Sequence, residues 1–399
     1  MFGLFACATP ALAHQALLSL QHRAQEGIAL ATAATHLEFK QSRGLLSSIP
    51  PDFFTPAPHT LGQVLGSYHD FYANESLAIA FCGHLHNTTT PAKFIATALE
   101  QAKAPSLEVK LQEIAPALKG AYAFLVLTPH ALVAMRDPFG YRPLFVGDLN
   151  GGFVLASETC ALQALGAINI KEVPPATLYT QQGAVPLAPS TPSPCVFEAI
   201  YFSRPSSIVF NQSVYALRAK LGQALAKEHP LKAHMVVPIP NSGTLAALAY
   251  AKERDLDFAP LLSLNPYVGR SFIESTQEGR ELKARQKFSL VTEGVQGKDI
   301  ILIDDSLVRG TTSRVVVQML KKAGTRHIHL LLTAPPILAP CLWGIDIPRE
   351  GELLSVLGGE AKAIGATSVG FLSLNALQAT INAPFCSHCF IPKNKDSHV

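Results

Sequence analysis

Two adjacent aspartates at the end of an apolar run are the residues of this sequence best suited to chemistry. Residues 301–317 read ILIDDSLVRGTTSRVVV, so Asp304 and Asp305 are followed by a turn centred on Gly310 and then by a helical pattern. Carboxylates accept hydrogen bonds from hydroxyl groups and are hard oxygen ligands for Mg²⁺. Because a carboxylate repels a phosphate, we expect Asp304 and Asp305 to contact sugar hydroxyls and a hydrated Mg²⁺ ion.

The turn that follows, residues 308–313, has the composition of a phosphate-binding site. It offers backbone N–H groups, hydroxyl groups and the N-terminus of a helix, which together stabilise a phosphate dianion. A sugar phosphate would satisfy both the turn and the two carboxylates. The alternative is an ordinary strand, turn and helix with a polar cap.

Strand and helix patterns alternate around these residues. Residues 235–239 and 299–303 are apolar runs typical of buried strands, and each is followed by a helical pattern, at 245–254 and 312–323. Such alternation predicts a parallel sheet with helices on both faces. Ligands of such sheets bind at the strand ends, which is where the aspartates stand.

The first half of the chain has a different pattern. A length of 399 residues suggests about two domains. Short apolar runs at 77–81, 122–127 and 132–135 predict strands separated by turns, and hence a domain built largely of sheet. Residues 172–195 are rich in proline and poor in charge, so we place a connection there, with the domain boundary near Ser193.

Composition excludes several classes of partner. The net charge of +3 gives no basic stripe for nucleic acid or for an anionic membrane. Residues 1–13 are apolar but lack a positive start and are interrupted by Pro10, which argues against a signal peptide. The apolar stretch 328–347 contains prolines and an aspartate and does not resemble a membrane span. The seven cysteines of so long a chain favour a reducing compartment, the cytoplasm.

Residues 301–317 resemble the phosphoribosyl-pyrophosphate (PRPP) signature of the glutamine PRPP amidotransferases, which catalyse the first committed step of purine synthesis. The likeness extends along nearly the whole chain and includes residues 201–205, 238–243 and 265–273. It implies an α+β N-terminal-nucleophile-hydrolase-like domain at 1–193. It further implies an α/β type I phosphoribosyltransferase domain at 194–375 and a C-terminal tail at 376–399.

The resemblance also implies a set of site residues. Ser242, Asp304 and Asp305 match the family's Mg²⁺ positions, the Ser242 loop faces pyrophosphate, and residues 267–273 close over PRPP. Asp304, Asp305 and Arg270 are expected to be catalytic. The expected PRPP-binding residues are Ser242, Ser306, Arg309, Gly310, Thr311, Thr312 and Ser313.

Three positions depart from the family pattern. Asn241 stands where the family usually has Asp, and Leu264 and Pro266 stand where it has Lys and Arg. Losing cations near a polyanion predicts weaker PRPP binding or slower transfer. The cations that remain nearby are Arg270, Arg280, Arg285 and Lys287.

Four cysteines form a second candidate site. The C-x-x-C spacing of Cys386 and Cys389 alone fits zinc, redox chemistry or no function. By the resemblance, Cys195, Cys341, Cys386 and Cys389 match the thiolate ligands of the iron–sulfur members of the family, which implies a structural [4Fe–4S] cluster. Tetrahedral zinc, or small residues that only fill space, are the alternatives.

The first domain resembles the family's glutaminase at residues 21–26, an expected early helix, and at 136–144 and 157–162. That chemistry needs an N-terminal cysteine whose free amine acts as base, but Phe2 occupies the matching position. Leu65 replaces the arginine that holds the glutamine carboxylate, and Cys82-Gly83-His84 replaces the Asn-Gly-Asn oxyanion motif. We therefore expect glutamine hydrolysis to be lost.

One feature of the degenerate site could give the chain a new metal-binding site. If residues 81–86 form a strand, then Cys82, His84 and His86 share one face at period two. Such soft ligands could bind a metal ion. The ordinary interpretation is that they fill a vacated pocket.

The leading hypothesis for function is an enzyme that converts PRPP and ammonia to 5-phosphoribosylamine and pyrophosphate. A related hypothesis is transfer of the phosphoribosyl group to another amine. The alternative class is a non-catalytic regulatory or scaffold subunit that binds PRPP and associates with an intact amidotransferase or a separate glutaminase. By the family's habit we expect a homo-oligomer.

Overall fold

The computed structural model describes residues 2–8, 12–66, 70–268, 279, 282 and 285–392. In this part of the chain no helix is both long and apolar enough to cross a membrane. The chain divides into two units, of which the first comprises Met1–Cys195, Leu342–Ile345 and Pro384–Cys386. The second comprises Val196–Cys341, Asp346–Ala383 and Ser387–Val399. The first unit therefore includes two short segments from late in the sequence.

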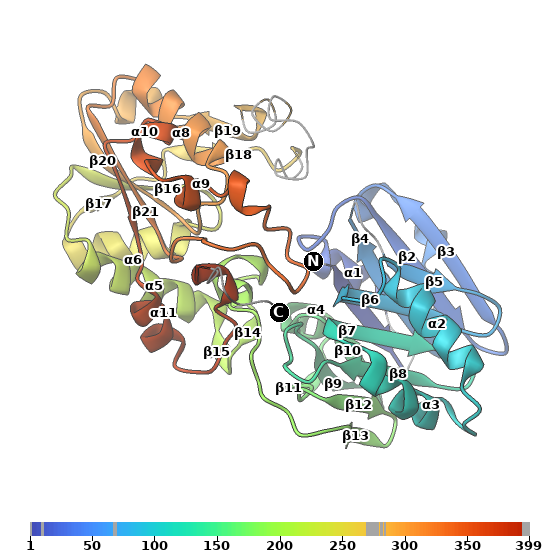
Figure 1. The fold of residues 1–399 in the computed structure, drawn as a ribbon. Helices are drawn as coiled ribbons and strands as arrows, with labels where there is room; N and C mark the ends of the chain where they lie inside the picture. Colours follow the sequence, from blue (N-terminus) through green and yellow to red (C-terminus); the bar gives the residue numbers. More distant parts are fainter. Residues whose placement is uncertain are drawn as a thin grey trace. The chain divides into compact units, whose positions relative to one another are not determined.

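The first unit is built on two antiparallel sheets that pack face to face (Figure 1). One sheet has the strand order β11-β9-β10-β1-β4-β2-β3 and the other β13-β12-β8-β7-β6-β5. The strands of the first sheet are β1 (Gly3–Cys7), β2 (Gly27–Ala33), β3 (Leu37–Arg43), β4 (His59–Leu65), β9 (Phe145–Leu149), β10 (Gly152–Ala156) and β11 (Ile168–Glu172). Those of the second are β5 (Phe71–Ala73), β6 (Ala78–Leu85), β7 (Gly120–Leu127), β8 (Leu132–Arg136), β12 (Thr177–Thr180) and β13 (Gly183–Pro186).

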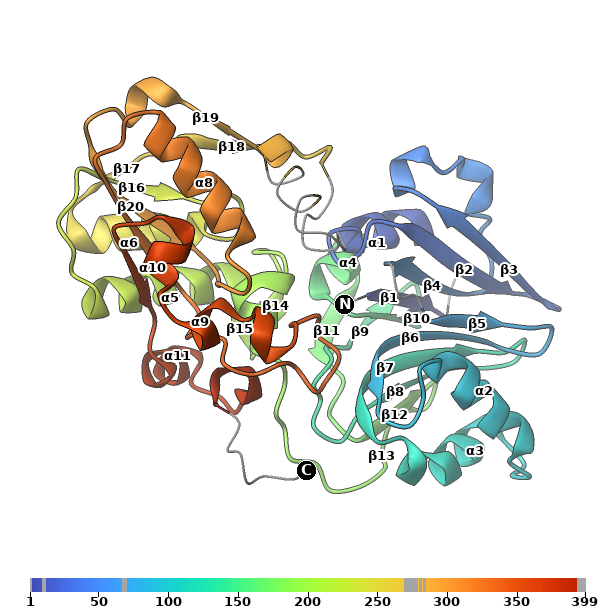
Figure 2. The same ribbon diagram turned by 45° about the horizontal axis from the view of Figure 1, so that its top comes forward.

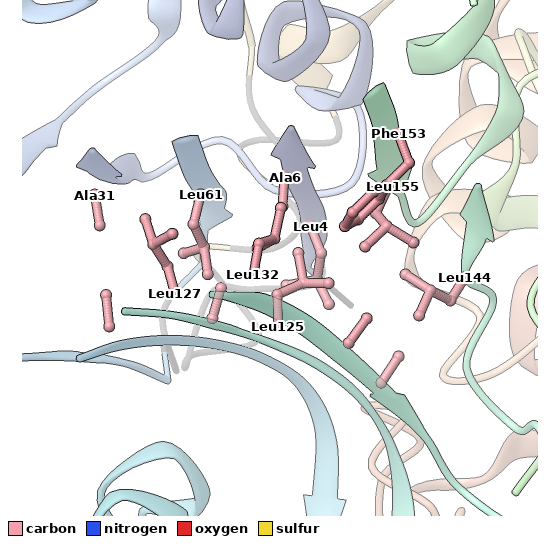
Figure 3. Close-up of a cluster of buried hydrophobic side chains, with 14 of the residues drawn as sticks. Leu4, Ala6, Ala31, Leu61, Leu125, Leu127, Leu132, Leu144, Phe153 and Leu155 are labelled. Carbon is pink, nitrogen blue, oxygen red and sulfur yellow. The ribbon is translucent and has the colours of Figure 1, made fainter. Parts of the chain in front are cut away.

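Side chains that alternate along β1 belong to two different apolar cores. Leu4 and Ala6 lie between the two sheets, in the same cluster as Leu125 of the second sheet (Figure 3). Phe5 and Cys7 point the other way, into a cluster beneath the helices. Successive side chains of a strand face opposite sides, so a strand this apolar must be covered on both faces.

Helices supply the outer cover. Helices α1 (Ala13–Leu20) and α4 (Thr159–Ala164) pack on the first sheet. Helices α2 (Pro91–Gln101) and α3 (Leu107–Ile114) pack on the second, on the far side of the stacked sheets (Figure 2). Short 3-10 turns lie at Leu46–Ser48, Pro51–Phe53 and Ala115–Ala117. This helix, sheet, sheet, helix order confirms the α+β N-terminal-nucleophile-hydrolase-like fold.

Two details of the first unit differ from the sequence-based expectations. Helix α1 ends at Leu20, so residues 21–26 follow the early helix instead of forming it. The proline-rich stretch is not a plain connection, because it contains the hairpin of β12 and β13, which joins the second sheet beside β8. Pro186 ends β13, the edge strand, where a missing N–H leaves no ladder partner unsatisfied.

The second unit has a five-stranded parallel sheet of order β17-β16-β20-β21-β22. Its strands are β16 (Met235–Pro238), β17 (Asp257–Phe258), β20 (Asp299–Asp304), β21 (His327–Leu332) and β22 (Ser368–Phe371). The helices are α5 (Val214–Glu228), α6 (Thr244–Arg254), α8 (Thr311–Lys322), α9 (Leu354–Leu357), α10 (Glu360–Ile364) and α11 (Leu374–Ile381). The predicted alternation of strands and helices is confirmed, as is the phosphoribosyltransferase-type fold.

The two crossovers at the centre of this sheet run in opposite directions. The chain goes from β16 through α6 to β17 on one side, and from β20 through α8 to β21 on the other. Because such crossovers are right-handed, α6 and α8 lie on opposite faces of the sheet (Figure 1). The smaller elements are the hairpins β14 (Ile208–Val209) with β15 (Gln212–Ser213) and β18 (Leu262–Leu264) with β19 (Phe288–Leu290), the π-helical turn Glu198–Phe202, and 3-10 turns at Thr292–Gly294, Glu350–Glu352 and His388–Phe390.

Candidate functional site

The crossover direction reverses between β16 and β20, so the carboxyl ends of these two strands form a topological switch point. Ligands of open parallel sheets bind at this kind of switch point. Asp304 is the last residue of β20, and Ser242 lies in the loop that follows β16. The Ser242 hydroxyl donates a hydrogen bond to Asp304 Oδ1 at 3.3 Å. The fold thus brings together two predicted site residues that are 62 positions apart.

The two aspartates form a buried pair of carboxylates. Asp304 and Asp305 are 6% and 7% exposed, and the Asp305 backbone N–H donates to Asp304 Oδ1 at 2.9 Å. Ser306 Oγ donates to Asp305 Oδ2 at 2.5 Å. Burial, and then the adjacent Asp305 carboxylate, raise the pKa of Asp304. A hard divalent cation would offset both effects, so these oxygens and the Ser242 hydroxyl fit Mg²⁺.

The turn predicted to bind phosphate contains a glycine, Gly310, that another residue could replace only with strain. Gly310 precedes the first turn of α8 with a φ of +72°, and a Cβ there would lie 2.7 Å from Leu354 Cδ2. The first backbone N–H groups of a helix have no partner within it. Thr311 Oγ1 is also buried and has no hydrogen-bond partner among the described residues. A phosphate at this point would satisfy these donors.

The cations expected around the site are only partly within the described structure. Arg309 lies in the turn, and its Nε donates to Glu352 Oε2 at 2.7 Å. Lys287 immediately precedes β19, and its Nζ lies 5.6 Å from the centre of the Phe288 ring. Arg270, predicted to be catalytic, lies outside the described residues, as does Arg280.

The four cysteines fall into one pair in each unit. In the first unit Cys195 and Cys386 are joined by a parallel β-bridge, and the Cys386 N–H donates to Pro194 O at 2.9 Å. In the second unit the Leu338 N–H donates a hydrogen bond to Cys389 O at 2.8 Å. Leu338 lies three residues before Cys341 in the sequence. Across residues 2–392, apart from the gaps given above, no cluster of three or more His, Cys, Asp or Glu is placed to hold a metal ion.

Phe2 and Leu65, which stand at the expected glutaminase positions, are packed among apolar side chains of the first unit. The Phe2 ring packs against Gly66, where a Cβ would lie 3.0 Å from Phe2 Cε1, and it borders both apolar cores. Leu65 is 3% exposed. Gln63, fully buried, donates from Nε2 to Phe81 O at 2.9 Å. None of Phe2, Leu65 and Gln63 carries a positive charge that could pair with a carboxylate.

The suggestion that Cys82, His84 and His86 form a metal site is not supported. Residues 78–85 do form a strand, β6, but Cys82 is 2% exposed and packs in the core between the sheets. His84 is exposed, and its ring centre lies 5.4 Å from that of His86. Cys82 therefore serves packing, because an apolar inter-sheet core excludes a hydrated cation.

Sequence reasoning missed the segment Leu342–Ile345, which belongs to the first unit. Trp343 stacks on Tyr141 with ring centres 4.5 Å apart, and Arg142 donates to Trp343 O. A Cβ on Gly344 would lie 2.7 Å from His84 Cβ, so this segment covers the end of β6. Although His84 is exposed by surface area, desolvation by the neighbouring atoms, and then the charges of His86 and Arg142, lower its pKa. A lone tryptophan beside a glycine was the only sequence signal.

Comparison with known proteins agrees with both units. A family described as a glutamine amidotransferase domain matches residues 71–164. An amidophosphoribosyltransferase of Archaeoglobus fulgidus is 33% identical over 430 residues, which cover 96% of this chain and 94% of that protein. The solved structure of a glutamine PRPP amidotransferase from B. subtilis, complexed with ADP and GMP, is 31% identical with a TM-score of 0.87 and covers 97% of this chain and 94% of its own.

A second solved structure is described as the allosteric regulatory enzyme of purine biosynthesis. It is 31% identical with a TM-score of 0.88, and the match covers 98% of this chain and 96% of that one. The likeness therefore includes the fold, the sequence and nearly the full length of each relative. The chain belongs to the amidophosphoribosyltransferase family.

Proposed function

We propose that this chain is a pentosyltransferase that makes 5-phosphoribosylamine and pyrophosphate from PRPP and free ammonia. The observation that carries the proposal is the site at the switch point, where Ser242, Asp304 and Asp305 converge beside the N-terminus of α8. A protein that only bound nucleotides would not need this convergence. The family's activity depends on a site of this composition.

Each part of the site has a distinct task in this proposal. The N-terminus of α8 and the Thr311 hydroxyl hold the phosphate on the ribose, and Asp304 and Asp305 orient the ribose hydroxyls. Mg²⁺, held by Ser242, Asp304 and Asp305, would supply positive charge to the leaving pyrophosphate. The ammonia nitrogen bonds to the anomeric carbon as the bond to the pyrophosphate oxygen breaks, with inversion, and the product amine releases a proton to water. Catalysis is then mostly positioning.

We further propose that the first unit does not hydrolyse glutamine. The Phe2 ring has no nucleophile and fills the space beside Gly66. Leu65 cannot pair with a carboxylate, and Cys82 packs in the core. These changes occur together in one site, which argues for a loss of function. Ammonia would then reach the second unit from solution or from a separate glutaminase.

The test is to mix the purified protein with PRPP and Mg²⁺ and to follow pyrophosphate release. Ammonium at high pH should support release, whereas glutamine should give no glutamate. Glutamate production by the unaltered chain would contradict the loss of glutaminase activity. Absence of pyrophosphate release with any amine would contradict the transferase.

We propose a structural [4Fe–4S] cluster on Cys195, Cys341, Cys386 and Cys389. The support is the close backbone pairing of Cys195 with Cys386 and the short span from the hydrogen bond at Cys389 O to Cys341. Thiolates suit iron–sulfur clusters or zinc. Iron and sulfide analysis of anaerobically purified protein tests this, and full zinc occupancy without iron would contradict it.

A second candidate function is a PRPP-binding regulatory or scaffold subunit. Leu264, at the end of β18, and exposed Asn241, beside Ser242, favour it because each replaces a polar or charged group of the family. Binding of PRPP without any burst of pyrophosphate would support it. We place the protein in the cytoplasm on its cysteine content and expect a homo-oligomer, with an intact paralogue or a separate glutaminase as further partners.

A further inference from the structure

Residues 350–364 contact the phosphate-binding turn, although none of them is among the proposed substrate-binding or catalytic residues. Glu352 Oε2 accepts a hydrogen bond from Arg309 Nε at 2.7 Å. Two residues later the Leu354 N–H donates to Val308 O at 2.9 Å. The same short segment therefore holds both the backbone and a side chain of the turn.

Packing reinforces these hydrogen bonds. A Cβ at Gly310 would lie 2.7 Å from Leu354 Cδ2 and 3.1 Å from Ile364 Cγ2, so both side chains press on the turn at its left-handed residue. Arg314, in the first turn of α8, donates from Nε to Ala363 O at 3.1 Å. Movement of residues 350–364 would therefore move the start of α8.

The hydrogen bond between Arg309 and Glu352 leaves the terminal nitrogens of the guanidinium available to bind an anion. Its side chain is 20% exposed and is held through Nε alone, and its two terminal nitrogens have no hydrogen-bond partner among the residues that the structure describes. A guanidinium presents its terminal nitrogens as a planar fork that matches two phosphate oxygens. Glu352 fixes the orientation of that fork.

We propose that Glu352 is a positioning residue, which holds Arg309 against the phosphate on carbon 5 of the ribose. This inference rests on the proposed function. In that proposal Asp304 and Asp305 bind the ribose and the Mg²⁺ held by Ser242 meets the leaving pyrophosphate, so the phosphate in the turn is the one on carbon 5. The segment 350–364 therefore affects the affinity for the phosphate on carbon 5 and does not affect the affinity for the pyrophosphate.

The experiment measures binding of ribose 5-phosphate and of pyrophosphate, each with Mg²⁺, to the full-length protein by calorimetry. Glu352→Gln should weaken ribose 5-phosphate binding about three- to fivefold, the effect expected for loss of one partly exposed ion pair, and leave pyrophosphate binding unchanged. In turnover, KM for PRPP should rise while kcat is retained. Glu350→Gln is the matched control, because it removes the same charge from the same 3-10 turn without touching Arg309.

A double-mutant cycle separates positioning from a merely structural role. Arg309→Ala should weaken ribose 5-phosphate binding at least as much, and adding Glu352→Gln to it should have no further effect. Glu352→Asp should recover part of the affinity. Equal effects of Glu352→Gln with and without Arg309, or of Glu350→Gln and Glu352→Gln, would overturn the inference. A wild-type protein that binds neither probe would instead overturn the proposed function, and the inference with it.

Discussion

Replacing Phe2 by cysteine should provide an N-terminal thiol that still does not hydrolyse glutamine. The Phe2 ring fills space against Gly66 at the edge of both apolar cores of the first unit. The cysteine supplies a thiol nucleophile, and loss of the ring opens space beside Gly66. It returns neither a partner for the substrate carboxylate nor donors for the oxyanion, and residues that act as one catalytic unit give little when only one is restored.

The expected loss of glutaminase rate in Phe2→Cys, relative to an intact site, follows from Leu65 and Cys82. Leu65 is 3% exposed, so a substrate carboxylate would be buried there without a cation, at a cost of about 3–5 kcal/mol. That corresponds to a factor of about 10²–10⁴. Cys82 offers no amide dipole, and loss of one oxyanion donor costs about 10²–10³ in rate. The two deficits together place the variant about 10⁴–10⁷ below an intact site.

The assay is glutamate release from glutamine in the presence of PRPP and Mg²⁺, with mass spectrometry to confirm a free N-terminal cysteine. Phe2→Leu controls for the effect of changing the ring, because it keeps an apolar side chain and adds no thiol. Glutamate production by Phe2→Cys within about 10²-fold of an intact family enzyme would refute the reasoning, since it would leave room for the loss of only one oxyanion donor.

Three further predictions concern other parts of the molecule. Asp304→Asn combined with Asp305→Asn should abolish pyrophosphate release with the fold retained, as shown by an unchanged circular dichroism spectrum; near-normal release would remove these residues from the site. Cys386→Ser should lower iron content and solubility together, which iron analysis of the soluble fraction checks. Folding lowers the pKa of His84, so the unfolded state binds a proton there more readily than the folded state. The free energy of unfolding should therefore decrease as the pH falls below about 6.5. His84→Asn should lessen that loss in thermal unfolding between pH 5 and about 7.

Sequence reasoning succeeded best where local pattern and chemistry coincide. The predicted strand at 299–303 and helix at 312–323 match β20 and α8 closely, because the apolar run, the glycine and the hydroxyl residues all specify the same strand, turn and helix. The convergence of Ser242 on Asp304 depends on sheet order, which no local pattern contains. It was reached only through resemblance to a known family.

The misses arose where tertiary contacts overrule composition. Residues 177–186 lie within the proline-rich stretch 172–195 that looks like a linker, yet the alternating side chains of β12 let this segment pair with β8. The stacking of Trp343 on Tyr141 joins positions about 200 residues apart, beyond any periodic signal. Glu352 was likewise missed, because an exposed acidic residue in a short turn is usually only solvated.

The discontinuity of the first unit has a consequence for how the protein is made. Residues 1–195 leave the ribosome well before the segments Leu342–Ile345 and Pro384–Cys386 that complete this unit. At translation rates of about 5–20 residues per second, Trp343 follows Tyr141 by roughly 10–40 seconds. During that interval the nascent unit exposes an aromatic surface, which makes it a target for chaperones and a point where a stalled or truncated chain would aggregate.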